Sequence, residues 1–184
     1  MLDLVEINME FFKNSAINNT KIYLQENSII NHAFISSSKY SSNLISKINI
    51  KQRTNSDYKL HSAIDGLSFG RLEIAINQLD GHANTELKSL QISKEDEQLT
   101  NFSNVEFNGP YGNLNQIQKS ISLDNSHSIF HGIINVPRIA QKTNASQLSR
   151  NLLLSDKATI DARPELKIIA DDVKCSHGAT ISQL

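Results

Sequence analysis

Residues 170–181 read Ala-Asp-Asp-Val-Lys-Cys-Ser-His-Gly-Ala-Thr-Ile, and the spacing of their side chains is typical of a β-strand. Val173, Ala179 and Ile181 alternate with polar positions, so the apolar side chains repeat every two residues. Cys175 and His177 share the parity of the apolar set. Since one face of a half-buried strand usually carries the apolar residues, this pattern predicts that Cys175 and His177 point inward.

Similar alternation of apolar and polar residues occurs earlier in the chain. Alternation recurs at 72–76 and again across Ile117, Ile121 and Leu123. Clusters of Asn, Asp, Gly and Pro that favour turns separate these segments, at 65–66, 80–82, 108–113 and 124–125. Helix signals are scarce, and the one local alternative is a helix over 84–90, with an Asn at its cap position. The chain is therefore predicted to be all-β.

Two all-β architectures fit short strands separated by polar turns, namely an antiparallel sandwich or barrel and a parallel β-helix. The 20 asparagines and 23 serines favour stacked coils, because repeated corners can align amides and hydroxyls in hydrogen-bonded ladders. The sequence shows no repeat of fixed period, however. The pattern alone leaves both architectures open.

Composition limits the range of partners and compartments. At 184 residues the chain is expected to form one domain, over 1–184. With 18 basic and 19 acidic residues and a net charge of -1, it has no charge pattern for binding nucleic acid or an anionic membrane. Its apolar runs fall short of the roughly 20 residues that span a bilayer, and no secretory signal is visible. The single cysteine suits a reducing compartment, so the cytoplasm or an organelle stroma is expected.

Several catalytic classes lack their sequence signals. Phosphate-binding loops, a nucleophile elbow and HExxH are absent, so the chain is predicted not to be an enzyme. Of the other histidines, His127 and His131 share a strand face but lie roughly 13 Å apart, too far for one metal ion. Those two are interpreted as structural or solvated, as are His32, His61 and His82.

Cys175 and His177 differ from the other candidates because they stand two apart on one strand face. A thiolate and an imidazole there can reach one ion, and both are ligands for iron or an iron-sulfur cluster. Two ligands are too few for a stable cluster, so such a site would be transient or shared. The alternative is a buried cysteine and a satisfied core histidine. The polar run at 141–147 and 150–151 is interpreted as a solvated strand face or an amide ladder.

Four sequence blocks resemble a known family. The segments 140–147, 150–155, 161–166 and 170–180 follow one another as in the core of the SufB/SufD family of iron-sulfur cluster assembly. The ending Cys-Ser-His-Gly-Ala-Thr at 175–180 is similar to the SufD branch, whereas SufB-like chains carry a Glu-His-Glu-Ala-Thr form there.

This resemblance implies a right-handed parallel β-helix that acts as a non-catalytic scaffold subunit. The implied partners are a SufB-like subunit and, in the full-length protein, a SufC-like ATPase. No cofactor is expected to bind stably; Cys175 and His177 would be transient ligands for iron or a cluster at the SufB interface. In isolation a homodimer is expected, because a coil stack has unpaired strand edges.

The sequence also departs from the family pattern. The helical N-terminal and C-terminal parts of the family are missing, which indicates a core fragment, and 99–107 replaces a histidine-rich stretch. The alternatives are a SufB-like paralogue, a purely structural coil, or a carbohydrate-interacting β-helix. A content of 6% aromatic residues without tryptophan counts against the last.

Overall fold

In a computed structural model, which describes residues 1–10 and 14–184, parallel strands stack into a coil. Every strand pairing in this part of the chain is parallel, and its regular structure is all strand. Residues 84–90, the local helix alternative, belong to a strand. The strands are β1 (Leu2–Glu10), β2 (Ser15–Leu24), β3 (Ile29–Gln52), β4 (Asp57–Gln78), β5 (Asn84–Ser93), β6 (Gln98–Phe107), β7 (Asn113–Ser122), β8 (His127–Val136), β9 (Asn144–Leu153), β10 (Thr159–Ile168) and β11 (Lys174–Gln183).

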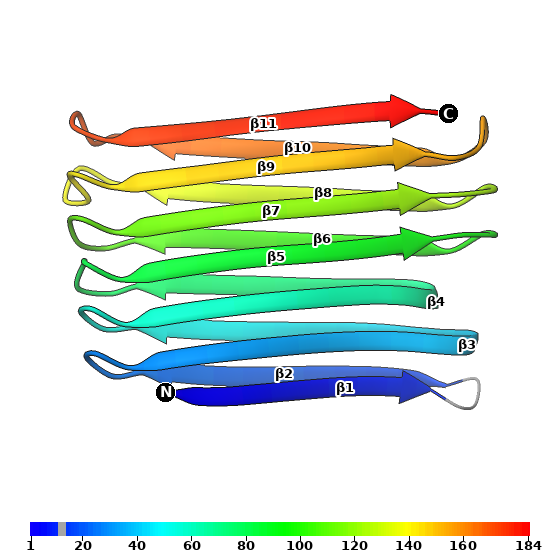
Figure 1. Cartoon of the computed structure of the whole chain (residues 1–184), viewed down its shortest axis with the longest axis horizontal. Helices are drawn as coiled ribbons and strands as arrows, with labels where there is room; N and C mark the ends of the chain where they lie inside the picture. Colours follow the sequence, from blue (N-terminus) through cyan, green and yellow to red (C-terminus); the bar gives the residue numbers. More distant parts are fainter. Residues whose placement is uncertain (11–13) are drawn as a thin grey trace.

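The strands form two facing sheets. The first sheet holds β1, β5, β7, β9 and β11, and the second holds β2, β6, β8 and β10. β3 and β4 bend around a corner, so that their first parts join the first sheet and their second parts the second. Figure 1 shows β5, β7, β9 and β11 in front running rightward, β6, β8 and β10 returning behind them, and the chain rising toward its C-terminus. That path is right-handed, and the predicted right-handed parallel β-helix is confirmed.

The length of one turn varies along the coil, which explains why no repeat is visible in the sequence. Directly paired residues of the first sheet follow one another at intervals of 28, 28, 27, 29, 31 and 30 residues: Leu2, Ile30, Tyr58, Thr85, Leu114, Ala145 and Cys175. The strands keep their register while the corners absorb the differences. A repeat defined by position in the coil therefore has no fixed period in the sequence.

Corners of the coil depend on residues with positive φ. Asn27, His82, Tyr111 and Lys142 all have φ between 53° and 62° at one end of the coil, and their amides donate to a carbonyl of the next corner along the chain. Asn tolerates this conformation better than most residues, and glycine tolerates it best. Gly81 has φ of 91°, and a Cβ there would lie 2.3 Å from the carbonyl oxygen of Pro110.

We expect Gly81→Ala to lower the free energy of unfolding by about 1–3 kcal/mol, because alanine would be strained at this φ and would strike backbone. Gly178→Ala is the matched control, since its Cβ would meet only Leu148 Cδ1 at 3.7 Å. Its expected change stays within about 0.5 kcal/mol. Chemical denaturation of both variants measures the free energy of unfolding. Equal losses in the two variants would contradict the role of Gly81 at the corner.

The interior of the coil changes character from one end to the other. Its early turns are filled by apolar side chains such as Phe34, Ile48 and Leu72. From β5 onward apolar residues such as Phe107 and Phe130 share the interior with many buried polar residues: Gln91, Asn101, Ser103, Gln116, Gln118, Ser120, Gln147, Ser149 and Asn151. No helix long and apolar enough to cross a membrane occurs in the described part of the chain.

On β7 the predicted alternation is present, but the apolar residues face outward. Gln116, Gln118 and Ser120 are buried, while Ile117 and Ile121 are half-exposed on the outer face. The inward amides satisfy one another, as where Asn101 Nδ2 donates to Gln118 Oε1 at 2.7 Å. The general expectation that the apolar parity faces inward is thus wrong for this strand, because hydrogen bonding lowers the cost of burying amides.

Candidate functional site

Cys175 and His177 lie on β11, the last strand of the first sheet. β11 pairs with β9, so that Cys175 lies beside Ala145 and His177 beside Gln147. Ala145 and Gln147 are both buried inside the coil, which confirms that the Cys175 and His177 parity points inward. Cys175 is nevertheless only half-buried and His177 is exposed. Among the described residues β11 is the last strand of its sheet and β10 faces it, and the exposure of His177 argues against the core-filling alternative for this residue.

The thiol of Cys175 packs against the edge of the apolar core. Burial raises its pKa from the ordinary value of 9.0, and a hydrogen bond with the backbone of Ala145 opposes this only in part. The thiol is therefore protonated near neutral pH and is a weak nucleophile. A metal ion that displaced the proton would convert it to a thiolate ligand.

A ladder of buried polar groups leads to the position below His177. Gln116 Nε2 donates to Ser103 Oγ at 2.7 Å, and Gln147 Nε2 donates to Gln116 Oε1 at 2.9 Å. Gln116, Gln147 and His177 are directly paired residues on successive strands of the first sheet. Gln116 thus accepts a hydrogen bond from Gln147, its counterpart one turn later.

Gln147 ends the ladder with an unused acceptor. Its Oε1 is buried and has no hydrogen-bond partner among the described residues, although Gln147 itself is only 1% exposed. His177 is the residue paired with Gln147 on the next turn of the coil. A buried acceptor without a partner costs about 1–3 kcal/mol, so an imidazole N–H from His177 is its natural donor.

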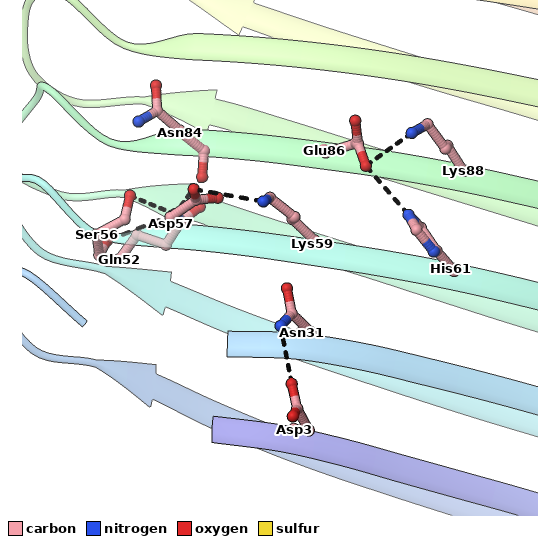
Figure 2. Close-up of polar contacts among 10 residues, drawn as sticks. All are labelled: Asp3, Asn31, Gln52, Ser56, Asp57, Lys59, His61, Asn84, Glu86 and Lys88. Atoms are coloured by element: carbon pink, nitrogen blue, oxygen red, sulfur yellow. Dashed lines mark hydrogen bonds and ion pairs between the residues drawn. The ribbon is translucent and has the colours of Figure 1, made fainter. Parts of the chain in front are cut away.

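Other histidines on the outer faces pair with carboxylates of the next strand. His61 Nε2 lies 3.1 Å from Glu86 Oε1, and Lys88 approaches the same oxygen at 2.9 Å (Figure 2). His127 lies 2.7 Å from Asp161 and His131 3.3 Å from Glu165. Figure 2 also shows Asn31 donating to Asp3 at 2.8 Å in the same outer layer. Within the described residues, no group of three or more His, Cys, Asp or Glu could hold a metal ion.

The sequence reasoning missed a buried polar chain near the N-terminal end. His32 Nδ1 lies 2.7 Å from the hydroxyl of Tyr58, and His32 Nε2 lies 2.9 Å from Glu6 Oε1. Thr20 donates to the other oxygen of Glu6 at 3.1 Å. Burial lowers the pKa of His32, with Glu6 acting in the opposite direction, and burial raises the pKa of Tyr58. These residues come from β1 to β4, so only the register of the coil brings them together.

The lowered pKa of His32 predicts a loss of stability in mild acid. Below the ordinary value of 6.5 the unfolded chain takes up a proton that folded His32 still refuses, so the free energy of unfolding falls as pH decreases. Chemical denaturation at pH 6.5 and at a pH about one unit lower measures this loss in the free energy of unfolding. The loss should be smaller in His32→Gln than in the wild type. If the free energy of unfolding of His32→Gln falls with pH as steeply as that of the wild type, the assignment of this pH dependence to His32 is refuted.

Comparison with known proteins gives the family. The model of the SUF system FeS cluster assembly, SufBD core domain, matches residues 3–184. An iron-sulfur cluster assembly SufBD family protein of Synechocystis is 39% identical over 165 residues, covering 90% of this chain and 36% of that protein. The chloroplastic protein ABCI7 of Arabidopsis thaliana is 36% identical, covering 89% of this chain and 35% of the relative.

Escherichia coli SufD, an iron-sulfur cluster assembly protein, is 38% identical over 108 residues, covering 58% of this chain and 26% of that protein. The chain thus spans about a third of the length of the first two relatives. The matched family model covers nearly all of the coil, including β10 and β11. The chain belongs to the SufBD core domain family of iron-sulfur cluster assembly.

Proposed function

We propose that the chain is a non-catalytic scaffold element for iron-sulfur cluster assembly, which pairs through its C-terminal edge with a SufB-like subunit. Nascent iron or cluster is the cargo. The name of the Escherichia coli relative, SufD, supports a SufD-type role within a SufB, SufC and SufD complex. The observation that carries the proposal is the arrangement of His177 and Cys175 on an edge strand that is open to a partner.

Among the described residues, β11 pairs with β9 on one side and with no strand on the other. Lys174 N donates to Thr143 O at 2.9 Å and Leu184 N donates to Leu153 O at 3.1 Å, so the even-numbered residues of β11 bond to β9. In a parallel ladder the odd-numbered residues then direct their N–H and C=O groups the other way. A partner strand that bonds there would lie directly over Cys175 and His177, since these two are odd-numbered.

Ligands for the cargo would come from both subunits. His177 would supply an imidazole and Cys175 a thiolate, and the partner would complete the set, because a cluster normally has four protein ligands. Gln147 Oε1 would accept from one ring nitrogen of His177 and leave the other nitrogen for the metal. Such support of a ligating histidine typically changes metal affinity by about 10–100-fold. Exposed apolar residues of β10 and β11, Ile168 and Ile181, would be covered in the same interface.

Energy for the cycle would come from a SufC-like ATPase bound by the full-length protein, in the cytoplasm or an organelle stroma. In isolation the same open edge would allow the chain to form a homodimer that imitates the SufB and SufD pair. Within this scheme the chain itself performs no bond-making step.

Ala179→Pro tests the pairing edge in the full-length protein. Ala179 is an exposed odd-numbered residue whose N–H points away from β9, and proline is tolerated on edge strands at such positions. We expect the variant to keep its fold and to lose binding to the SufB-like subunit by at least tenfold. Calorimetry of the purified subunits measures this binding.

Thr180→Pro is the contrasting variant, because its N–H bonds to β9. It should lower the free energy of unfolding by about 3 kcal/mol. If Ala179→Pro binds the SufB-like subunit as tightly as the wild type, the proposed edge is refuted.

A further inference from the structure

The outer face of the first sheet carries an apolar surface over β5, β7 and β9. Six outward side chains form it, and we call these residues together with Lys119 and Arg150 the outer patch: Leu90, Ile92, Ile117, Ile121, Leu148 and Leu152. On the same strands the inward positions hold Gln91, Gln116 and Gln147. Polar residues inside and apolar residues outside reverse the usual arrangement of a sheet, which favours a covered outer face.

Register arranges the outer patch in rows along the coil axis. Ile92, Ile121 and Leu152 are directly paired and form one row, and Ile117 pairs with Leu148 in another. Between these rows Leu90, Lys119 and Arg150 are directly paired and form the middle row. A hollow of about 450 Å³ adjoins the rows, with Leu90, Ile117 and Lys119 in its lining.

The charges of the outer patch have no counterpart within it. The outward residues of β7 and β9 include Lys119 and Arg150 but no Asp or Glu, and the one outward carboxylate of β5, Glu86, already pairs with Lys88 and His61. No ion pair joins Lys119 or Arg150 to any described residue. Two neighbouring cations repel each other, so this part of the face attracts carboxylates.

From these rows we propose that the outer patch docks an acidic amphipathic helix of a partner protein. Successive rungs of the coil lie about 4.8 Å apart and successive turns of a helix about 5.4 Å apart, so a helix along the coil axis meets one rung per turn over three rungs. Apolar side chains of the helix contact the two apolar rows. A stripe of carboxylates between them pairs with Lys119 and Arg150.

Other occupants fit the observations less well. An anionic membrane would be held by only two cations of the outer patch, on a chain whose net charge is -1. A second copy of this chain has no helix in its described part to offer. The acidic amphipathic helix satisfies the apolar rows and the charges together.

A synthetic helical peptide with leucines on both sides of a stripe of glutamates is the probe. We expect saturable binding to the wild-type chain in fluorescence anisotropy, weakened by salt. Methyl NMR shifts should concentrate at Ile117, Ile121 and Leu148. The double variant Lys119→Glu with Arg150→Glu should weaken binding at least tenfold and should gain affinity for a peptide with lysines in the stripe.

The matched control is Lys21→Glu with Lys47→Glu, the same charge change on the outer face of the second sheet, which should bind the acidic peptide within about twofold of wild type. No saturable binding below about 1 mM would overturn the proposal, as would equal loss in both double variants. Anionic phospholipid vesicles that shift the same methyl groups would assign the patch to a membrane. A concentration-dependent dimer that shifts them would assign it to a second copy.

Discussion

Replacing His177 by alanine in the full-length protein is expected to lower iron-sulfur cluster assembly with the SufB-like subunit by at least about tenfold, while the free energy of unfolding changes by less than about 0.5 kcal/mol. The first effect follows from losing an imidazole that would bind the cargo. The second follows from exposure, because His177 is exposed and packs little against the core. Iron and sulfide content of the reconstituted complex, with thermal unfolding of the subunit, measures both.

The control is His127→Ala, the same change on the outer face of the second sheet, where His127 lies 2.7 Å from Asp161. It should leave cluster assembly within about twofold of wild type. Gln147→Leu separates the ligand role of His177 from the role of the residue that positions it. The variant removes the acceptor Oε1 but keeps the imidazole of His177. We expect a loss of cluster assembly between those of the other two variants. Normal assembly in His177→Ala, or a loss only in proportion to unfolded protein, would end the ligand hypothesis.

Phe107→Ala is expected to lower the free energy of unfolding by about 3–5 kcal/mol, a large share of the 5–15 kcal/mol typical of a whole domain. Phe107 is 0% exposed, and its ring lies against Gly112, where an added Cβ would come within 2.4 Å of Phe107 Cδ1. The site cannot collapse around the loss, because the strands on both sides are fixed by parallel ladders.

Phe102→Ala, five residues earlier on β6, is the matched control for Phe107→Ala. Phe102 faces outward, is half-buried and meets His131 edge-on with ring centroids 5.3 Å apart. Its loss should cost about 1 kcal/mol. Urea denaturation measures the free energy of unfolding of the two variants. Equal losses would mean that the inward and outward faces of β6 are assigned wrongly.

Local patterns in the sequence determined the strands and one part of the site. Period-two alternation located parts of β4, β7 and β11, and turn clusters located corners at β4 and β7, because both depend on residues close together in the chain. The parity of residues 173–181 correctly placed Cys175 and His177 on the inward face. The family resemblance, carried by the blocks from 140 onward, chose the coil over the sandwich where pattern could not.

Tertiary structure alone decided how these strands stack and which side chains meet. Register between turns of 27 to 31 residues places Gln147 beneath His177 and Glu6 beside His32, and no local signal encodes such distances. Stacking also turned the apolar residues of β7 outward, because the buried amides of neighbouring turns satisfy one another. Burial and hydrogen bonding of these side chains depend on partners about one turn away, so they follow from the fold and not from the local sequence.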